Sequence, residues 1–310
     1  MFGLNSTYLR TFVEVGNFGS LSRAAALLKI SQPAISRQIR KLEDDLGVSL
    51  IIRHGRGVVL TEAGVVVHRH ATEILKQVAN VRSELAALRT APSGKVTVGV
   101  PFTIGPLLGP ALLKTTGERY PGVFLKVVSA NSNTLLEWLV SGRIDIAILQ
   151  LMRPPQNLIV EPLLQEDLYL IGPPDNEVFQ SKTVPMRNVM NLPLYLSEAG
   201  SELRRFLDAA AQSAGIAYNV VVEMDSIEMM KAMARAGGFS IMPISTVREE
   251  IKHGVLAASM IVMPTPQRVM MLATTSFQPL SVATRAVAET MRRTVRDLVS
   301  SGEWVATLPR

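Results

Sequence analysis

The first fifty residues of the chain carry hydrophobic positions at helical spacing, interrupted twice by polar residues and glycines. A short helix is predicted from about 7 to 15, and the glycines at 16 and 19 end it. Ser20 is placed to cap a second helix and Ser31 a third, with Pro33 in the first turn, where a missing N–H costs nothing. Three short helices therefore open the chain.

The third predicted helix has one apolar stripe and a polar remainder. Its hydrophobic residues follow at steps of 4, 3 and 4 and are Ile35, Ile39, Leu42 and Leu46. The other faces carry Gln32, Ser36, Arg37, Arg40 and Lys41. The N-terminal residues of a recognition helix face base edges in the major groove, where glutamine can pair with adenine and arginine with guanine. The pattern predicts such a helix, which Gly47 ends.

Two apolar runs, 50–52 and 58–60, flank a turn that contains two glycines and the arginines Arg53 and Arg56. This pattern predicts a two-stranded hairpin. Taken alone, the hairpin is better explained as an exposed polar turn. Directly after a recognition helix, it indicates a wing whose tip contacts a phosphate backbone or a minor groove.

A long helix is predicted after Thr61, which caps it. Its hydrophobic residues alternate at steps of 4 and 3 and are Val67, Ala71, Ile74, Val78, Val81, Leu85 and Leu88. Such alternation is typical of a coiled-coil seam between two chains, whereas a helix lying on its own domain usually has a wider stripe. We therefore expect a homodimer and a pseudo-palindromic DNA operator.

From residue 95 onward, strand-like and helix-like runs alternate. Strands are expected at 96–100, 123–128 and 144–148 with helices between them, which predicts a parallel βαβαβ unit. A second unit begins near 168, and the chain returns through a strand at 269–275 and a helix at 281–300. The expected division is 1–61 (winged helix-turn-helix), 62–91 (linker helix) and 95–310 (an α/β domain with lobe I at 95–166 and 269–310 and lobe II at 167–268).

Polar residues recur where predicted strands lead into helices. They are Thr103, Ser132, Thr134, Ser197, Ser201, Asp225 and Ser226. Each one alone is at least as well explained as a helix cap. As a group they predict a binding site between the lobes for a small polar molecule, and helix N-termini favour an anion.

The net charge of +6 is concentrated at the N-terminus, since residues 1–90 contain 12 Lys and Arg against 7 Asp and Glu. A basic small domain on a nearly neutral large one suggests a polyanionic partner. The chain has no cysteine and four histidines without a neighbouring acidic cluster, and no catalytic motif, so we expect no enzyme, metal or cofactor. We also expect no signal peptide, no membrane association and a cytoplasmic location.

The stretch from Phe12 to Gly64 resembles the LysR-type transcriptional regulators, through S-Q-P-A-I-S-R-Q-I-R-K-L-E and the closing L-T-E-A-G. The motifs L-L-E-W-L-V-S-G-R-I-D-I-A-I and R-A-G-G-F-S-I-M-P extend the resemblance over the rest of the chain, and within the family it looks closest to the nitrogen-assimilation-control branch. The resemblance implies base readout by Gln32, Pro33, Ser36 and Arg37 and minor-groove insertion by Arg56.

For the larger domain, the resemblance implies two lobes similar to type 2 periplasmic binding proteins, with Thr103 and Ser132 at the usual effector positions. It also implies paired linker helices, and many relatives are tetramers, so dimer and tetramer both stay open. Where many relatives have Glu-Gly before the ligand serine, this chain has Ser129-Ala130, so a relative's ligand does not transfer.

Two other classes compete with a DNA-binding regulator. A solute-binding protein or small anabolic enzyme on the two-lobed fold would need neither the polar third helix nor the wing. A non-specific architectural DNA protein would not need the large second domain. The sequence leaves open the effector and its existence, the operator, and the sign of regulation.

Overall fold

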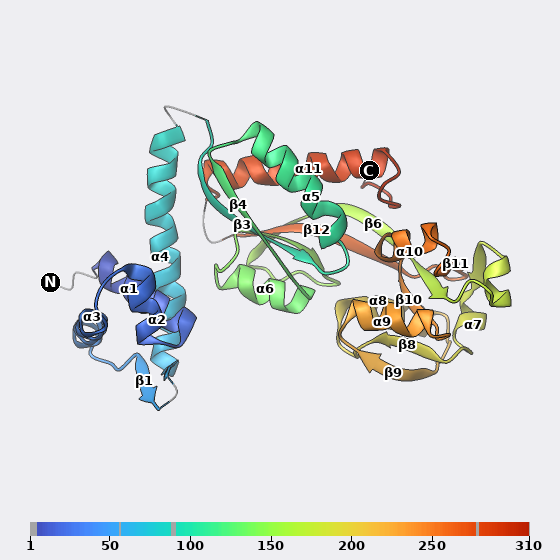
Figure 1. The fold of residues 1–310 in the computed structure, drawn as a ribbon, viewed down its shortest axis with the longest axis horizontal. Coiled ribbons are helices and arrows are strands. Elements are labelled where there is room, and N and C mark those ends of the chain that lie inside the picture. The colour runs from blue at the N-terminus through green and yellow to red at the C-terminus, as the bar shows by residue number, and fades with distance from the viewer. Residues whose placement is uncertain (1–4, 56, 88–90, 277–278, 310) are drawn as a thin grey trace. The chain divides into compact units, whose positions relative to one another are not determined.

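A computed structural model describes residues 5–55, 57–87, 91–276 and 279–309, and leaves the side chains of residues 80 and 82–87 undescribed (Figure 1). The chain divides into two compact units. Unit 1 contains residues 1–90 and 141–143, and unit 2 contains the rest. Each unit has a hydrophobic core of its own.

Unit 1 consists of four helices and a hairpin. They are α1 (Ser6–Phe18), α2 (Leu21–Leu28), α3 (Gln32–Leu46), β1 (Ile51–His54), β2 (Gly57–Leu60) and α4 (Glu62–Ala87). The predicted caps are confirmed, since the Ser20 hydroxyl accepts the N–H of Arg23 and the Ser31 hydroxyl that of Ala34. Helix α1 runs to Phe18, past the predicted end, because the left-handed residue that ends it is Gly19 and not Gly16.

The core of unit 1 uses the apolar stripe of α3. Ile35, Ile39 and Leu42 are buried against Phe12 of α1. Strands β1 and β2 pair antiparallel, with Arg53 opposite Val58, as the predicted wing requires. The Val58 N–H also donates to the Gly19 carbonyl at 2.9 Å, which joins the wing to the end of α1.

Unit 2 begins with the predicted βαβαβ unit, formed by β3 (Gly94–Pro101), α5 (Gly105–Arg119), β4 (Val123–Ala130), α6 (Ser132–Val140) and β5 (Ile146–Gln150). Strand β3 lies between β4 and β5 and is parallel to both. In Figure 1, α5 and the last helix, α11 (Val282–Ser300), lie on one face of this sheet and α6 lies on the other. This arrangement forms lobe I.

Two long neighbouring strands connect lobe I to lobe II. β6 (Leu158–Gly172) and β12 (Gln267–Thr275) are antiparallel, and β12 also pairs antiparallel with β5. The sheet is therefore mixed and not wholly parallel. The sequence predicted only residues 168–171 of β6 as a strand, because polar residues such as Gln165 and Glu166 interrupt the apolar run.

Lobe II contains the elements between these two strands. They are η1 (Glu177–Gln180), β7 (Thr183–Pro185), α7 (Met186–Val189), β8 (Leu194–Ser197), α8 (Glu202–Ser213), β9 (Val220–Met224), α9 (Ile227–Arg235), β10 (Ser240–Pro243), η2 (Ile244–Val247), α10 (Arg248–Lys252) and β11 (Ala257–Val262). The methionines of this lobe are mostly core residues; Met230 is buried, although Met229 is exposed. No described helix is long and apolar enough to span a membrane.

Candidate DNA-binding surface and ligand site

The polar face of α3 is turned to solvent. Because Ile35, Ile39 and Leu42 point into the core, the side chains on the other faces are left outside. Ser36 is half-buried, and the exposed residues are Gln32, Pro33, Arg37, Arg40 and Lys41. A helix with three exposed cations and two uncharged donors can approach a duplex without burying an unpaired charge.

Neighbouring residues orient two glutamines of α3. The Ser22 hydroxyl donates to Gln32 Oε1 at 3.2 Å, which leaves the Gln32 amide N–H groups pointing outward as donors. The buried Thr11 hydroxyl donates to Gln38 Oε1 and joins α1 to α3. In this arrangement Gln32 can donate to an acceptor on a base or phosphate, and its oxygen, which has a second lone pair, can still accept from adenine.

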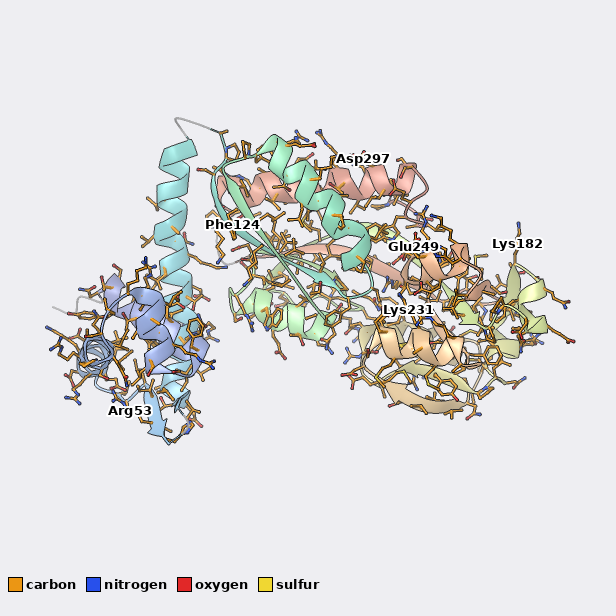
Figure 2. All side chains as sticks on the ribbon, viewed as in Figure 1. Arg53, Phe124, Lys182, Lys231, Glu249 and Asp297 are labelled. Carbon is orange, nitrogen blue, oxygen red and sulfur yellow. The ribbon has the colours of Figure 1, made fainter. Side chains whose placement is uncertain are left out.

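The wing is anchored to α3 by a residue that sequence reasoning did not select. One carboxylate oxygen of Glu43 accepts the N–H groups of Leu50 at 2.7 Å and Ile51 at 3.3 Å. Arg53 is exposed on β1, as Figure 2 shows. Arg56, predicted at the wing tip, lies outside the described residues. Glu43 therefore fixes the position of the wing relative to the recognition helix.

The sequence L-T-E-A-G forms a tight junction between the wing and α4. The Thr61 hydroxyl donates to the Ser49 carbonyl at 2.8 Å and accepts the Gly64 N–H at 2.9 Å. A Cβ atom on Gly64 would lie 2.0 Å from the Leu50 carbonyl oxygen. Only glycine fits at this position without moving the helix away from the wing.

The predicted seam on α4 divides into two parts. Ala71 is 1% exposed in the core of its own unit, which removes it from the predicted dimer contact, whereas Val67 packs against that core and stays partly exposed. Ile74, Val78 and Val81 are 40%, 42% and 55% exposed, so they form an apolar surface without a partner in the described chain. The Leu85 side chain and Leu88 lie outside the described residues. The apolar stripe is wider than a coiled-coil seam in the N-terminal half of α4, because this half also covers the core of unit 1.

Two of the predicted effector residues, Thr103 and Ser132, belong to one buried polar cluster in unit 2. Arg268 of β12 donates through Nη1 to Thr103 Oγ1 and to Gln150 Oε1, both at 3.1 Å. The Gln150 N–H donates to Ser132 Oγ at 3.2 Å. Asn131, and not Ser132, caps α6, because its side chain accepts the Thr134 N–H. The Ser132 hydroxyl is therefore not needed as a helix cap.

The predicted residues of lobe II form a second group. The Ser201 hydroxyl donates to Ser197 Oγ at 2.9 Å and accepts the Arg204 N–H as the cap of α8. Ser226 caps α9, and Asp225 is exposed beside it. Ser201 and Ser226 thus match the helix-cap explanation, and no hydrogen bond between described residues joins this group to Thr103 or Ser132.

A charged network supports the lobe II group. Arg204, buried on α8, donates to the Ser197 carbonyl at 3.2 Å and to Glu223 at 2.9 Å. The Ala199 N–H and then Arg204 hold the pKa of Glu223 below its usual value by hydrogen bonding to its carboxylate. Among the described residues, no cluster of His, Cys, Asp or Glu could hold a metal ion.

The two units together define a class of protein, a winged helix-turn-helix joined to a two-lobed α/β domain. Residues 7–65 match the family model "Bacterial regulatory helix-turn-helix protein, lysR family", and residues 89–296 match "LysR substrate binding domain". The chain is 34% identical over 256 residues to the HTH-type transcriptional regulator BbuR of Bordetella bronchiseptica, covering 82% of this chain and 79% of BbuR. The chain belongs to the LysR family of transcriptional regulators.

Other similarities agree with this assignment. The nitrogen assimilation regulatory protein nac of Klebsiella aerogenes is 31% identical over 247 residues, which cover 79% of this chain and 80% of that protein. Full-length OxyR of Pseudomonas aeruginosa has the same fold, with a TM-score of 0.79 at 24% identity over 96% of both chains. CbnR, in complex with its target DNA, has a TM-score of 0.57 at 23% identity, over 94% of this chain and 100% of CbnR.

The family assignment sets the general function. The chain is a DNA-binding transcriptional regulator with an effector-binding domain, and it is not an enzyme. Regulators of this family bind operator DNA and small-molecule effectors and form oligomers. The relatives do not single out the nitrogen-assimilation-control branch, since BbuR shares the larger identity.

Proposed function

We propose that this regulator reads its operator through the exposed face of α3 and holds the duplex with its wing. The observation that carries the proposal is the exposed set Gln32, Pro33, Arg37, Arg40 and Lys41 on a helix whose opposite face is fully buried. Ser36 and Arg53 extend this surface, and Arg56 is assigned to the minor groove by its place in the motif. Direct base contacts supply specificity, and the other cations contact phosphates.

We propose that the chain acts as a homodimer joined along α4. The exposed Ile74, Val78 and Val81 support this contact, because they lie at steps of 4 and 3 on one helix face. Leu85 and Leu88 continue the same spacing in the sequence. A dimer of this kind binds two half-sites of a pseudo-palindromic operator, and a tetramer would add a contact elsewhere.

We also propose that an effector binds between the lobes, beside Thr103 and Ser132, with Ser197 and Ser201 facing it from lobe II. The division 1–61, 62–91 and 95–310, with lobe boundaries at 166/167 and 268/269, then separates DNA binding, pairing and sensing. The effector acts by favouring one arrangement of the lobes, through its differential affinity for the two arrangements. Because its target is chromosomal DNA, we assign the protein to the cytoplasm.

The test of the DNA-binding proposal is selection of genomic fragments by the purified full chain, followed by footprinting. We expect one enriched sequence with two related half-sites. Val78→Asp would place a charge in the seam and should remove protection of one half-site, whereas Val65→Asp, on the opposite side of the same helix, should not. Enrichment of random DNA would contradict the proposal that α3 reads the operator. Equal footprints from both variants would contradict the proposed dimer contact.

The test of the sensing proposal uses Ser132→Trp, which fills the proposed site. The variant should keep its operator affinity and lose any change in reporter transcription that small molecules cause in the wild type. Normal regulation by Ser132→Trp in cells would show that no effector acts at this place.

A further inference from the structure

The buried cluster around Arg268 consists of an ion pair with a fixed set of hydrogen bonds. Arg268 and Glu166 are each 1% exposed, and Arg268 Nε and Nη2 both donate to Glu166 Oε2, at 2.8 and 2.6 Å. The other carboxylate oxygen, Oε1, accepts from Ser245 Oγ at 2.6 Å and from Trp304 Nε1 at 2.9 Å. The charge of Arg268 is thus compensated, and four donors occupy Glu166.

The ion pair determines how the amide of Gln150 is oriented. The guanidinium of Arg268 has donors only, so the Gln150 atom that faces it at 3.1 Å must be the oxygen. Exchanging the amide oxygen and nitrogen would place two donors against each other. Gln150 Nε2 is therefore turned away from Arg268, and it is buried without a hydrogen-bond partner, in a residue that is 3% exposed.

An unpartnered buried amide N–H group destabilises the folded protein, and such groups are few in folded proteins. The two hydroxyls of the cluster also have unused hydrogen-bond donors. Thr103 Oγ1 accepts from Arg268 and Ser132 Oγ accepts from the Gln150 N–H, which leaves each hydroxyl its own hydrogen to donate. The cluster therefore has spare donors at three side chains, while each oxygen of Glu166 already accepts two hydrogen bonds.

We infer that Gln150 is a ligand-reading residue and that the ligand presents an acceptor oxygen, of a carboxylate or a carbonyl group, to its Nε2. This inference rests on the proposed effector site beside Thr103 and Ser132 and specifies the chemistry that this site accepts. Gln150 Nε2 can only donate, so an ammonium or guanidinium group, which also only donates, would leave it without a partner. Arg268 and Glu166 are positioning residues, which act by holding the amide of Gln150 in one orientation.

The experiment uses the purified full chain and matched sets of small molecules that share one skeleton, such as butyrate, butyramide and butylammonium, or benzoate, benzamide and benzylammonium. The midpoint of thermal unfolding is measured for each, and titration calorimetry is applied to compounds that raise it. We expect members with an acceptor oxygen to stabilise the wild type and the matched ammonium compounds to have no effect. Equal or greater stabilisation by the ammonium members would overturn the inference.

The variant Gln150→Glu keeps the shape of the side chain and replaces its spare donor with an acceptor. It should bind the stabilising carboxylate or amide at least about 10-fold more weakly, the loss expected for one hydrogen bond. Gln156→Glu is the matched control. Gln156 is exposed, so this substitution adds the same charge away from the cluster. Gln150→Met removes the donor without adding charge and should also weaken binding. It replaces Gln150→Glu in the test if that variant folds poorly. Unchanged affinity in either folded Gln150 variant would refute the assignment.

The same measurements separate this inference from the broader proposals. If only compounds without an acceptor oxygen stabilise the chain, and Ser132→Trp abolishes their effect, the sensing proposal stands and the assignment of Gln150 is wrong. If no compound with an acceptor oxygen stabilises the chain, the inference fails. The operator footprint, measured on the same preparations, tests DNA binding independently of both results.

Discussion

The proposed DNA-binding surface and the proposed ligand cluster are built in opposite ways. The first is a row of exposed side chains on a single helix, α3, whose neighbours in space are neighbours in sequence. The second is buried, and its central hydrogen bonds join residues 102 and 165 positions apart. A surface that must meet a long polyanion can be regular and solvated, whereas a site for one small molecule must fix donors and acceptors inside the protein.

The largest effect should come from breaking the ion pair of the buried cluster. Arg268→Met leaves the Glu166 carboxylate buried without its cation and should lower the free energy of unfolding of unit 2 by about 3–5 kcal/mol. Chemical denaturation of the full chain measures this change. Arg37→Met is the matched control on the exposed surface and should leave stability nearly unchanged. Similar losses in the free energy of unfolding for both variants would contradict the difference between the buried and the exposed site.

The second effect concerns the junction between the wing and α4. Gly64→Ala places a Cβ where the Leu50 carbonyl oxygen would be 2.0 Å away, so the helix or the wing must shift. We expect a loss of about 1–3 kcal/mol in stability, as for overpacked positions. Gly55→Ala is the control, because a Cβ at Gly55 meets nothing within 4 Å. Equal thermal unfolding midpoints for the two variants would count against the tight junction.

The third effect is on binding and not on folding. Arg37→Ala should weaken operator binding by about 1–3 kcal/mol while random duplex DNA is bound nearly as before, because a base contact contributes to specificity. Arg10→Ala, an exposed arginine on α1, should change neither. Fluorescence anisotropy with operator and scrambled duplexes checks both. An equal loss on the two duplexes would assign Arg37 to the phosphate backbone instead.

The smallest effect is a pH dependence of unit 1. Burial lowers the pKa of His68, whose Nε2 lies 3.2 Å from the Val13 carbonyl and can donate to it in the neutral form. Neutral His68 therefore stabilises the fold above the usual histidine pKa of about 6.5, and the stabilisation is lost as the pH falls.

Thermal unfolding at pH 7.5 and pH 5.5 measures this dependence, and His68→Gln should reduce it. His70→Gln is the control two residues away, since the His70 side chain is 58% exposed and pairs with Glu73. A wild-type midpoint that does not change between these pH values, or an equal reduction in both variants, would exclude His68 as the cause.

The sequence was sufficient for the parts of the molecule that depend on local order. The helical period of Ile35, Ile39 and Leu42, together with the caps Ser20 and Ser31, predicted the three-helix unit, and the structure confirms it. The parallel β3–β4–β5 unit followed from alternating runs. Local patterns succeed here because the same residues that form an element also bury its apolar face.

The sequence was insufficient where the tertiary fold decides. Ala71 has the spacing of a coiled-coil seam and yet packs in its own unit, because the first half of α4 covers the core of unit 1. Gln150, Glu166 and Arg268 were not predicted as site residues, since they lie in three different strands and no sequence motif links them. A charged residue inside an otherwise apolar strand was the available signal, but its partner is not visible without the fold.

Trp304 gives the sensing domain an optical reporter of its own state. Its indole N–H donates to the same carboxylate that holds Arg268, and it is one of only two tryptophans in the chain, the other being Trp138. In a Trp138→Phe background, the emission wavelength and lifetime of this single fluorophore follow the polarity around Glu166. Occupancy of the proposed neighbouring site can then be read from the unlabelled protein in solution, in real time and without attached dyes.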